Sequence, residues 1–154
     1  MRIPAKRPQT IATNNVIDKY MLGMCGEYAV CSELLKRGKM ASITMGNAKS
    51  VDIIVTDPSC SKYKKIEVKT SQTTKFVTSF FKKYYDIKMP HPDIWVLVHV
   101  DANTKAIRYF ILEHEVLGNI QMKRNKISSW QYSNGCDNVL LKEVLKYENR
   151  WDII

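Results

Sequence analysis

The sequence predicts an α/β protein in which helices flank a central mixed β-sheet. Three observations support this fold class: a helical period in residues 17–35, a series of short strand-like segments in residues 51–112, and helical patterns after residue 112. One helix, three or four consecutive strands and further helices are typical of a sandwich around one sheet. The 154 residues are enough for one domain with its own core. We expect residues 14–154 to form that domain and residues 1–13 to be a loosely ordered basic arm.

We expect the first helix to begin at Asn14 or Asn15, which are suitable N-caps, and to end before Gly38. Glu27 lies on the apolar stripe of this helix, which should be buried. Its carboxylate either reaches water at the edge of the stripe or needs a partner, such as a lysine, a metal ion or a proton. The apolar positions of the stripe are Ile17, Tyr20, Met24, Cys31, Leu34 and Leu35.

Four later segments are expected to form strands. Val51–Val55 is short, apolar and rich in β-branched residues, which suits a buried strand, and Lys65–Ser71 alternates strictly between two faces. Ile94–Val100 is the strongest candidate for a central strand, and Ala106–Leu112 follows it as a hairpin partner.

The remaining segments are expected to be loops and helices. Residues 73–88 should form a loop with a short helix, which ends before Pro90 and Pro92. Helices are expected over Glu113–Gln121 and Asn138–Tyr147, because apolar residues recur in the second of these at helical spacing.

The chain is strongly basic, with 24 Lys and Arg against 15 Asp and Glu and a formal net charge of +9. Such a charge favours polyanions, of which nucleic acid is the commonest in a cell, although solubility would also account for it. Eight lysines lie between Ser61 and Pro90, interleaved with six aromatic residues. This stretch either holds a phosphate backbone and stacks on bases, or is a half-buried segment whose aromatics enter the core. The lysines assigned to nucleic-acid binding are Lys62, Lys64, Lys75, Lys82 and Lys83.

The use of cysteine and histidine argues against a structural zinc site. The four cysteines are far apart, and none of the three histidines lies at ligand spacing from a cysteine. The chain opens with polar and basic residues rather than a secretory signal, and no run approaches the roughly 18 apolar residues of a membrane helix. We therefore expect reduced thiols, a cytoplasmic location and no membrane partner.

Asp52, Glu67 and Lys69 form the candidate active site. Hydrolysing a phosphodiester at neutral pH requires charge neutralisation at phosphorus and a deprotonated water, and Mg²⁺ held by carboxylates supplies both. If the strands that carry Asp52 and Glu67 pair, the two carboxylates can converge. Lys69 projects from the same face as Glu67 and can polarise the attacking water or stabilise negative charge. Gln72 follows closely enough to orient a water or a phosphate.

Three segments resemble the PD-(D/E)xK nuclease superfamily, which has the restriction-endonuclease-like fold. They are Gly26-Glu27 on the helix, residues 51–55 around Asp52, and residues 66–71 with Glu67 and Lys69, in the order of the Holliday-junction-resolvase-like branch. In that family the Asp and Glu ligate Mg²⁺ or Mn²⁺, the Lys assists the nucleophile and the helix Glu completes or orients the metal site. The resemblance therefore implies metal ligation by Asp52, Glu67 and Glu27, and catalysis by these residues together with Lys69. It covers residues 14–71, with Val51 where the family motif has Pro.

The (D/E)xK motif alone is weak evidence, because Asp86-Ile-Lys88 also matches it and lacks strand character. Strand context is what distinguishes Glu67 and Lys69. The resemblance implies a Mg²⁺-dependent DNA endonuclease acting in repair, recombination or defence. The alternative is a non-catalytic nucleic-acid-binding or accessory domain of the same fold. The expected partner is branched or double-stranded DNA, and a homodimer would supply one site for each strand.

Overall fold

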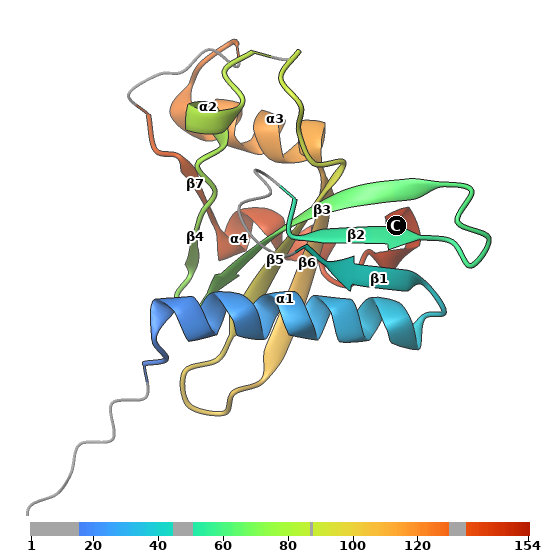
Figure 1. Cartoon of the computed structure of the whole chain (residues 1–154). Helices are drawn as coiled ribbons and strands as arrows, with labels where there is room; N and C mark the ends of the chain where they lie inside the picture. The colour runs from blue at the N-terminus through green and yellow to red at the C-terminus, as the bar shows by residue number, and fades with distance from the viewer. Residues whose placement is uncertain (1–15, 45–50, 87, 130–134) are drawn as a thin grey trace, which may run out of the picture.

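A five-stranded mixed sheet lies at the centre of the computed structural model, which describes residues 16–44, 51–86, 88–129 and 135–154 (Figure 1). Its strands lie in the order β1, β2, β3, β5, β6; β3 and β5 run parallel, and the other neighbours are antiparallel. The predicted α/β class with a mixed sheet and flanking helices is confirmed. The strands are β1 (Met40–Ile43), β2 (Ile53–Thr56), β3 (Tyr63–Ser71), β5 (Ile94–Val100) and β6 (Ile107–Glu113).

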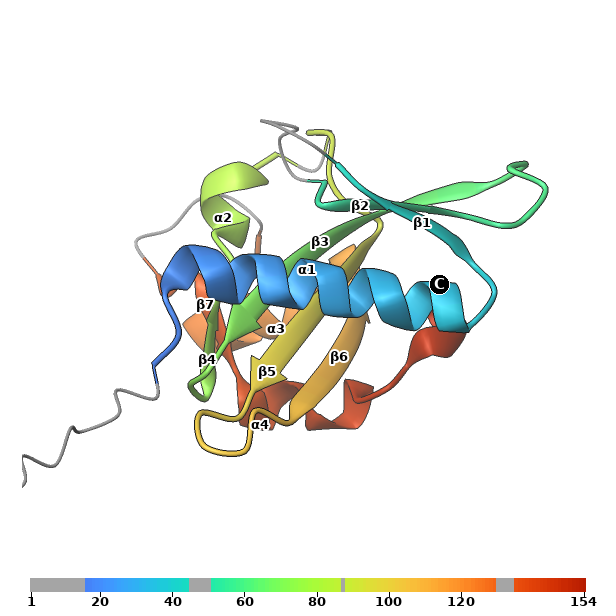
Figure 2. The same cartoon turned by 60° about the horizontal axis from the view of Figure 1, so that its bottom comes forward.

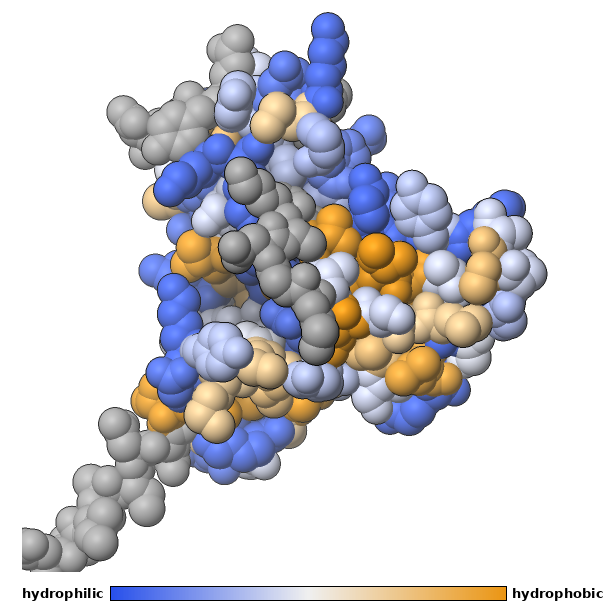
Figure 3. All heavy atoms as spheres, viewed as in Figure 1, coloured by the Kyte–Doolittle hydropathy of each residue, from blue (hydrophilic) through white to orange (hydrophobic). Residues whose placement is uncertain are grey.

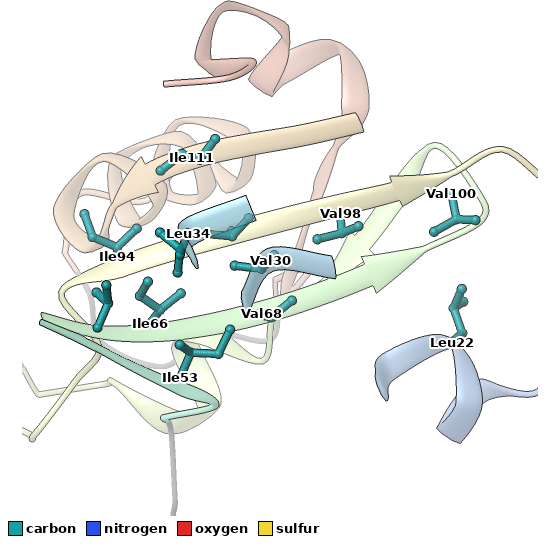
Figure 4. Close-up of a cluster of buried hydrophobic side chains, with 12 residues drawn as sticks. Leu22, Val30, Leu34, Ile53, Ile66, Val68, Ile94, Val98, Val100 and Ile111 are labelled. Atoms are coloured by element: carbon teal, nitrogen blue, oxygen red, sulfur yellow. The ribbon is translucent and has the colours of Figure 1, made fainter. Parts of the chain in front are cut away.

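The two faces of the sheet carry separate hydrophobic cores. Alternate residues of β5 enter opposite cores, which explains why the sequence of this strand is apolar almost throughout. Helix α1 (Lys19–Lys36) covers the first core and crosses the sheet in front of β3 and β5 (Figure 2). Val30 and Leu34 of α1 lie close to Ile66 and Val68 of β3 in this core (Figure 4).

Helix α1 begins at Lys19 because Asp18 is its N-cap. The Asp18 carboxylate accepts hydrogen bonds from the backbone N–H groups of Tyr20 at 2.9 Å and Met21 at 3.3 Å. The prediction that Asn14 or Asn15 caps the helix is therefore wrong, since residues 16–18 are not helical.

The buried face of α1 also differs from the predicted stripe. Tyr20 is 74% exposed and Leu35 is 54% exposed, so the stripe that includes them is wrong. The residues that face the sheet are instead spaced four apart, as one side of a helix requires. They are Leu22, Gly26, Val30 and Leu34.

The second face of the sheet is covered by α3 (His114–Asn125) and by a small sheet of β4 (Lys75–Val77) and β7 (Asn138–Leu140). The one-turn helix α2 (Phe80–Lys83) follows β4. Four aromatic residues of the basic stretch are at most 2% exposed and pack in this second core, so of the two alternatives for the stretch, aromatics in the core holds for these four and stacking on bases does not. They are Phe76, Phe80, Phe81 and Tyr84.

Two further expectations are corrected by strand pairing. The predicted helix Asn138–Tyr147 begins as strand β7, because these residues pair with β4, and only then becomes α4 (Leu141–Val144) and η1 (Leu145–Tyr147). Strand β1 is not predicted from the sequence, since it is a short edge strand without a buried residue. A last helical turn, η2, spans Trp151–Ile153.

The described surface is mainly hydrophilic on the face that Figure 3 shows, with hydrophobic patches near β1 and β2, where Met40 is 53% exposed. None of the helices in the described ranges could span a membrane. The four cysteines are free thiols. The predicted basic arm, residues 1–13, lies outside the described residues.

Candidate active site

The site lies at the β2–β3 fork, the point after the pair Ile53–Ile66 where the two strands separate. Beyond Ile66, strand β3 continues to Ser71 with β5 as its paired neighbour. Asp52 occupies this fork: its N–H donates to the Ile66 carbonyl at 2.8 Å, and its Oδ2 accepts the N–H of Val68 at 2.7 Å. Asp52 thus stands directly before β2. The prediction had placed it inside a strand over residues 51–55. The fork anchors its carboxylate against β3.

Glu67 and Lys69 project from the same face of β3, as their spacing predicts. Lys69 Nζ donates to Glu67 Oε1 at 2.5 Å. A second ammonium group, Nζ of Lys83 from α2, donates to the same oxygen at 3.0 Å. The Glu67 side chain is 2% exposed, and within the described part of the chain its other oxygen, Oε2, is buried with no hydrogen-bond partner. A buried carboxylate is therefore held by two lysines on one side and left unsatisfied on the other.

Glu27 reaches the site from α1. It is half-buried and lies beside Gly26, where α1 approaches β3 closely: a Cβ built on Gly26 would lie 1.9 Å from Thr70 Oγ1. The sequence singled out Glu27 because of its position on a predicted apolar stripe, and that stripe is not the buried face of α1. Its place next to the buried face of α1 nevertheless brings it to the same cleft as Asp52.

A cleft of about 550 Å³ joins these groups. Glu67 lies beneath it, because its side chain is buried under Lys69 and Lys83. The cleft wall is rich in lysine, which favours a polyanion. Charged residues that line it are Lys19, Glu27, Asp52, Lys69, Lys75 and Lys83. Lys19 is absent from the predicted set, because nothing in the local sequence distinguishes it from other surface lysines.

The negative charges of the site carboxylates repel one another. Burial, together with the charge of Glu67, raises the pKa of Asp52, although the Val68 N–H and the two lysines lower it. Burial and the charge of Asp52 likewise raise the pKa of Glu27, which Lys69 lowers. Clustered ionisable groups with shifted pKa values are typical of functional sites.

The five lysines predicted to bind nucleic acid separate into three groups. Lys75 and Lys83 line the cleft. Lys62 and Lys64 lie near the turn between β2 and β3, beside a different hollow, where Lys64 Nζ donates to the Ile153 carbonyl at 2.5 Å. Lys82 is exposed and lines none of the described clefts around the site.

Two other predicted features have local structural roles. Gln72 Oε1 accepts the N–H of Ile17 at 2.8 Å and so ties the start of α1 to the end of β3. Asp86 Oδ1 accepts the N–H of Lys88 at 2.9 Å, so these two residues of the second motif match lie outside a strand, as expected.

A metal ion was predicted at Asp52, Glu67 and Glu27. Among the residues that the structure describes, no three His, Cys, Asp or Glu side chains already stand at the spacing of a metal site. The chemistry of the donors nevertheless suits Mg²⁺ or Mn²⁺, which prefer carboxylate oxygens. The unsatisfied Oε2 of Glu67 also fits a cation, because a buried acceptor without a donor is costly.

Comparison with known proteins extends these observations. No family model matches the sequence, and no curated protein matches it. A solved structure of a bacterial homing endonuclease, I-Ssp6803I, is similar with a TM-score of 0.56 and 13% identity, over 88% of this chain and 91% of that chain. Hjc of Archaeoglobus fulgidus, a Holliday junction resolvase from an archaeal hyperthermophile, has a TM-score of 0.46 and 13% identity, over 80% of this chain and 88% of that chain. The likeness to the homing endonuclease shows a shared fold.

Proposed function

We propose that this chain, which has the restriction-endonuclease-like fold of the PD-(D/E)xK nucleases, is an endonuclease that hydrolyses phosphodiester bonds in DNA. The observation that supports the proposal most is the meeting of Asp52, Glu67 and Lys69 at the β2–β3 fork. Glu27 lies on the wall of the same cleft. Repair, recombination or defence against foreign DNA would use such an activity.

In this proposal the carboxylates hold a divalent cation. Asp52 and Glu67 would be the principal ligands of Mg²⁺ or Mn²⁺, and Glu27 would complete or orient the site. When bound, the cation supplies positive charge at the phosphorus and lowers the pKa of a water molecule. The Val68 N–H keeps the Asp52 carboxylate in place, since it bonds one oxygen of Asp52 and leaves the other for a ligand.

Lys69 is proposed to act on the nucleophile and on the phosphate. Its ammonium group lies against Glu67 and is partly exposed to the cleft, so it can donate a hydrogen bond to a water or to a phosphate oxygen there. Water would attack the phosphorus in line with the 3′-oxygen, whose bond to phosphorus breaks as the new bond forms. The ammonium group would stabilise the negative charge that develops on the phosphate oxygens.

DNA is the proposed substrate because of charge. The chain carries a formal net charge of +9, and Lys19 and Lys75 line the cleft beside the candidate catalytic groups. Branched or double-stranded DNA would meet two such sites in a homodimer, which is part of this proposal.

Cleavage by the purified chain tests the proposal. Supercoiled plasmid, linear duplex and a four-way junction would each be incubated with Mg²⁺, Mn²⁺, Ca²⁺ or EDTA. We expect nicked or cut products in Mg²⁺ or Mn²⁺ and none in EDTA, because the carboxylates alone cannot neutralise the phosphate. Salt-dependent DNA binding without cleavage of any substrate would contradict the proposed nuclease activity. It would favour the alternative, a non-catalytic nucleic-acid-binding or accessory domain.

A further inference from the structure

We infer that Lys83 is a second catalytic lysine of this site, one that contacts the phosphate being cleaved, rather than one of several lysines that hold DNA at a distance. The inference rests on the proposed function and deepens it. Lys83 lies 16 residues from Glu67 in the sequence, yet its Nζ lies 3.0 Å from Glu67 Oε1. Its side chain is 38% exposed and lines the cleft, so a substrate can reach it.

The fold places Lys83 by a set of specific contacts. Asp137, just before β7, accepts the N–H groups of Phe81 at 3.0 Å and Lys82 at 3.1 Å, and so fixes the first turn of α2. Phe80 and Phe81 are fully buried, which anchors α2 in the second core. These contacts fix the backbone of Lys82 as well as that of Lys83, and the Lys83 side chain is held further by its ion pair with Glu67. A lysine that only attracted DNA would need no such ion pair, because screened surface charges act without a defined geometry.

A strained residue, Ser79, directly precedes α2 and helps to orient it. Ser79 has φ of 54°, in the left-handed region that residues other than glycine rarely adopt. Its carbonyl accepts the N–H of Lys83 at 3.1 Å, and Ser79 itself lines the cleft. The turn at Ser79 therefore sets the direction in which α2 leaves β4 and orients Lys83 toward Glu67.

Charge explains what a second lysine would do. Three carboxylates, Glu27, Asp52 and Glu67, surround the place where a phosphodiester anion would enter, and Lys69 alone offsets one of them. Lys83 adds a second positive charge beside the same carboxylate, Glu67, and presents hydrogen-bond donors to the cleft. Fixed donors aimed at developing negative charge lower a barrier more than mobile surface charges do.

The closing experiment compares Lys83→Met with Lys82→Met, its matched control. Both remove one positive charge from α2, but Lys82 does not line the cleft. Under saturating DNA and Mg²⁺, we expect kcat to fall about 100-fold for Lys83→Met and less than threefold for Lys82→Met. KM for DNA should change by a similar small factor in both, and Lys83→Arg should recover most of the lost kcat.

Mn²⁺ binding, measured without DNA by electron paramagnetic resonance, separates catalysis from structure. Lys83→Met should bind Mn²⁺ as tightly as the parent or up to about tenfold more tightly, because a neighbouring cation has been removed. Equal kcat values for the two variants would overturn the inference, and so would weakened Mn²⁺ binding in Lys83→Met, since Lys83 would then act only through Glu67. The proposed function fails separately, if the parent protein does not cleave DNA.

Discussion

Asp52→Asn should lower the rate of DNA cleavage by about a thousandfold or more, the largest effect that we expect from any single substitution in this protein. Asparagine keeps the shape of the side chain, and its oxygen can still accept the Val68 N–H that holds Asp52 at the β2–β3 fork. It removes the negative charge that a divalent cation requires. The measurement is single-turnover cleavage of plasmid DNA in Mg²⁺, together with a Mn²⁺ titration that should show weakened binding.

The same substitution should stabilise the fold. Folding raises the pKa of Asp52, so between its ordinary value and the raised one the folded state binds more protons than the unfolded state. The free energy of unfolding must therefore fall as pH rises through that window, and above it the ionised carboxylate costs stability in full. Asparagine cannot ionise, so Asp52→Asn should gain about 1 kcal/mol at pH 7, or roughly 2–4 °C in Tm.

Thermal unfolding at several pH values without divalent metal checks this second effect. The gain of Asp52→Asn over the parent should be largest at neutral pH and should vanish at pH values low enough to protonate the parent carboxylate in both states. A variant less stable than the parent at every pH would show that Asp52 is mainly structural. Loss of cleavage would then no longer identify a catalytic carboxylate.

Gly26→Ala should destabilise the protein by about 2–3 kcal/mol, the largest loss of stability that we expect from so small a change. The new Cβ would lie 1.9 Å from Thr70 Oγ1 and 3.0 Å from Thr70 Cβ, so rotation of the threonine hydroxyl alone cannot relieve the overlap. Helix α1 must move away from β3. Because Glu27 is the next residue, cleavage should fall as well, and both Tm and activity should be measured.

Gly23→Ala is the matched control, since it lies one turn earlier on α1 with nothing within 4 Å of the added Cβ. It should stabilise the protein by up to about 1 kcal/mol, because alanine favours helix more than glycine does. A second change, Thr70→Ala, should restore part of the stability that Gly26→Ala loses. If Gly23→Ala and Gly26→Ala have the same Tm, the close approach of α1 to β3 does not constrain the fold.

Local patterns predicted the parts of this protein that depend on neighbours in the chain. The alternation of residues 65–71 placed Glu67 and Lys69 on one face of β3, because side chains two apart in a strand must share a face. The apolar run 94–100 identified β5, which is buried on both faces. Where local patterns were ambiguous they failed: the helical spacing after Asn138 was overridden by pairing with β4, and the N-cap was one of several polar residues near Asp18.

The sequence by itself determined the fold class, the strand that carries Glu67 and Lys69, and the chemical types of the site residues. Only the tertiary structure decided which lysine joins them. Lys82 and Lys83 are adjacent and identical in type, and what separates them is the direction of one helical turn, set by the turn at Ser79 and by Asp137. Such contacts depend on how distant segments pack, and a periodicity within one segment carries no information about the surface against which that segment will lie.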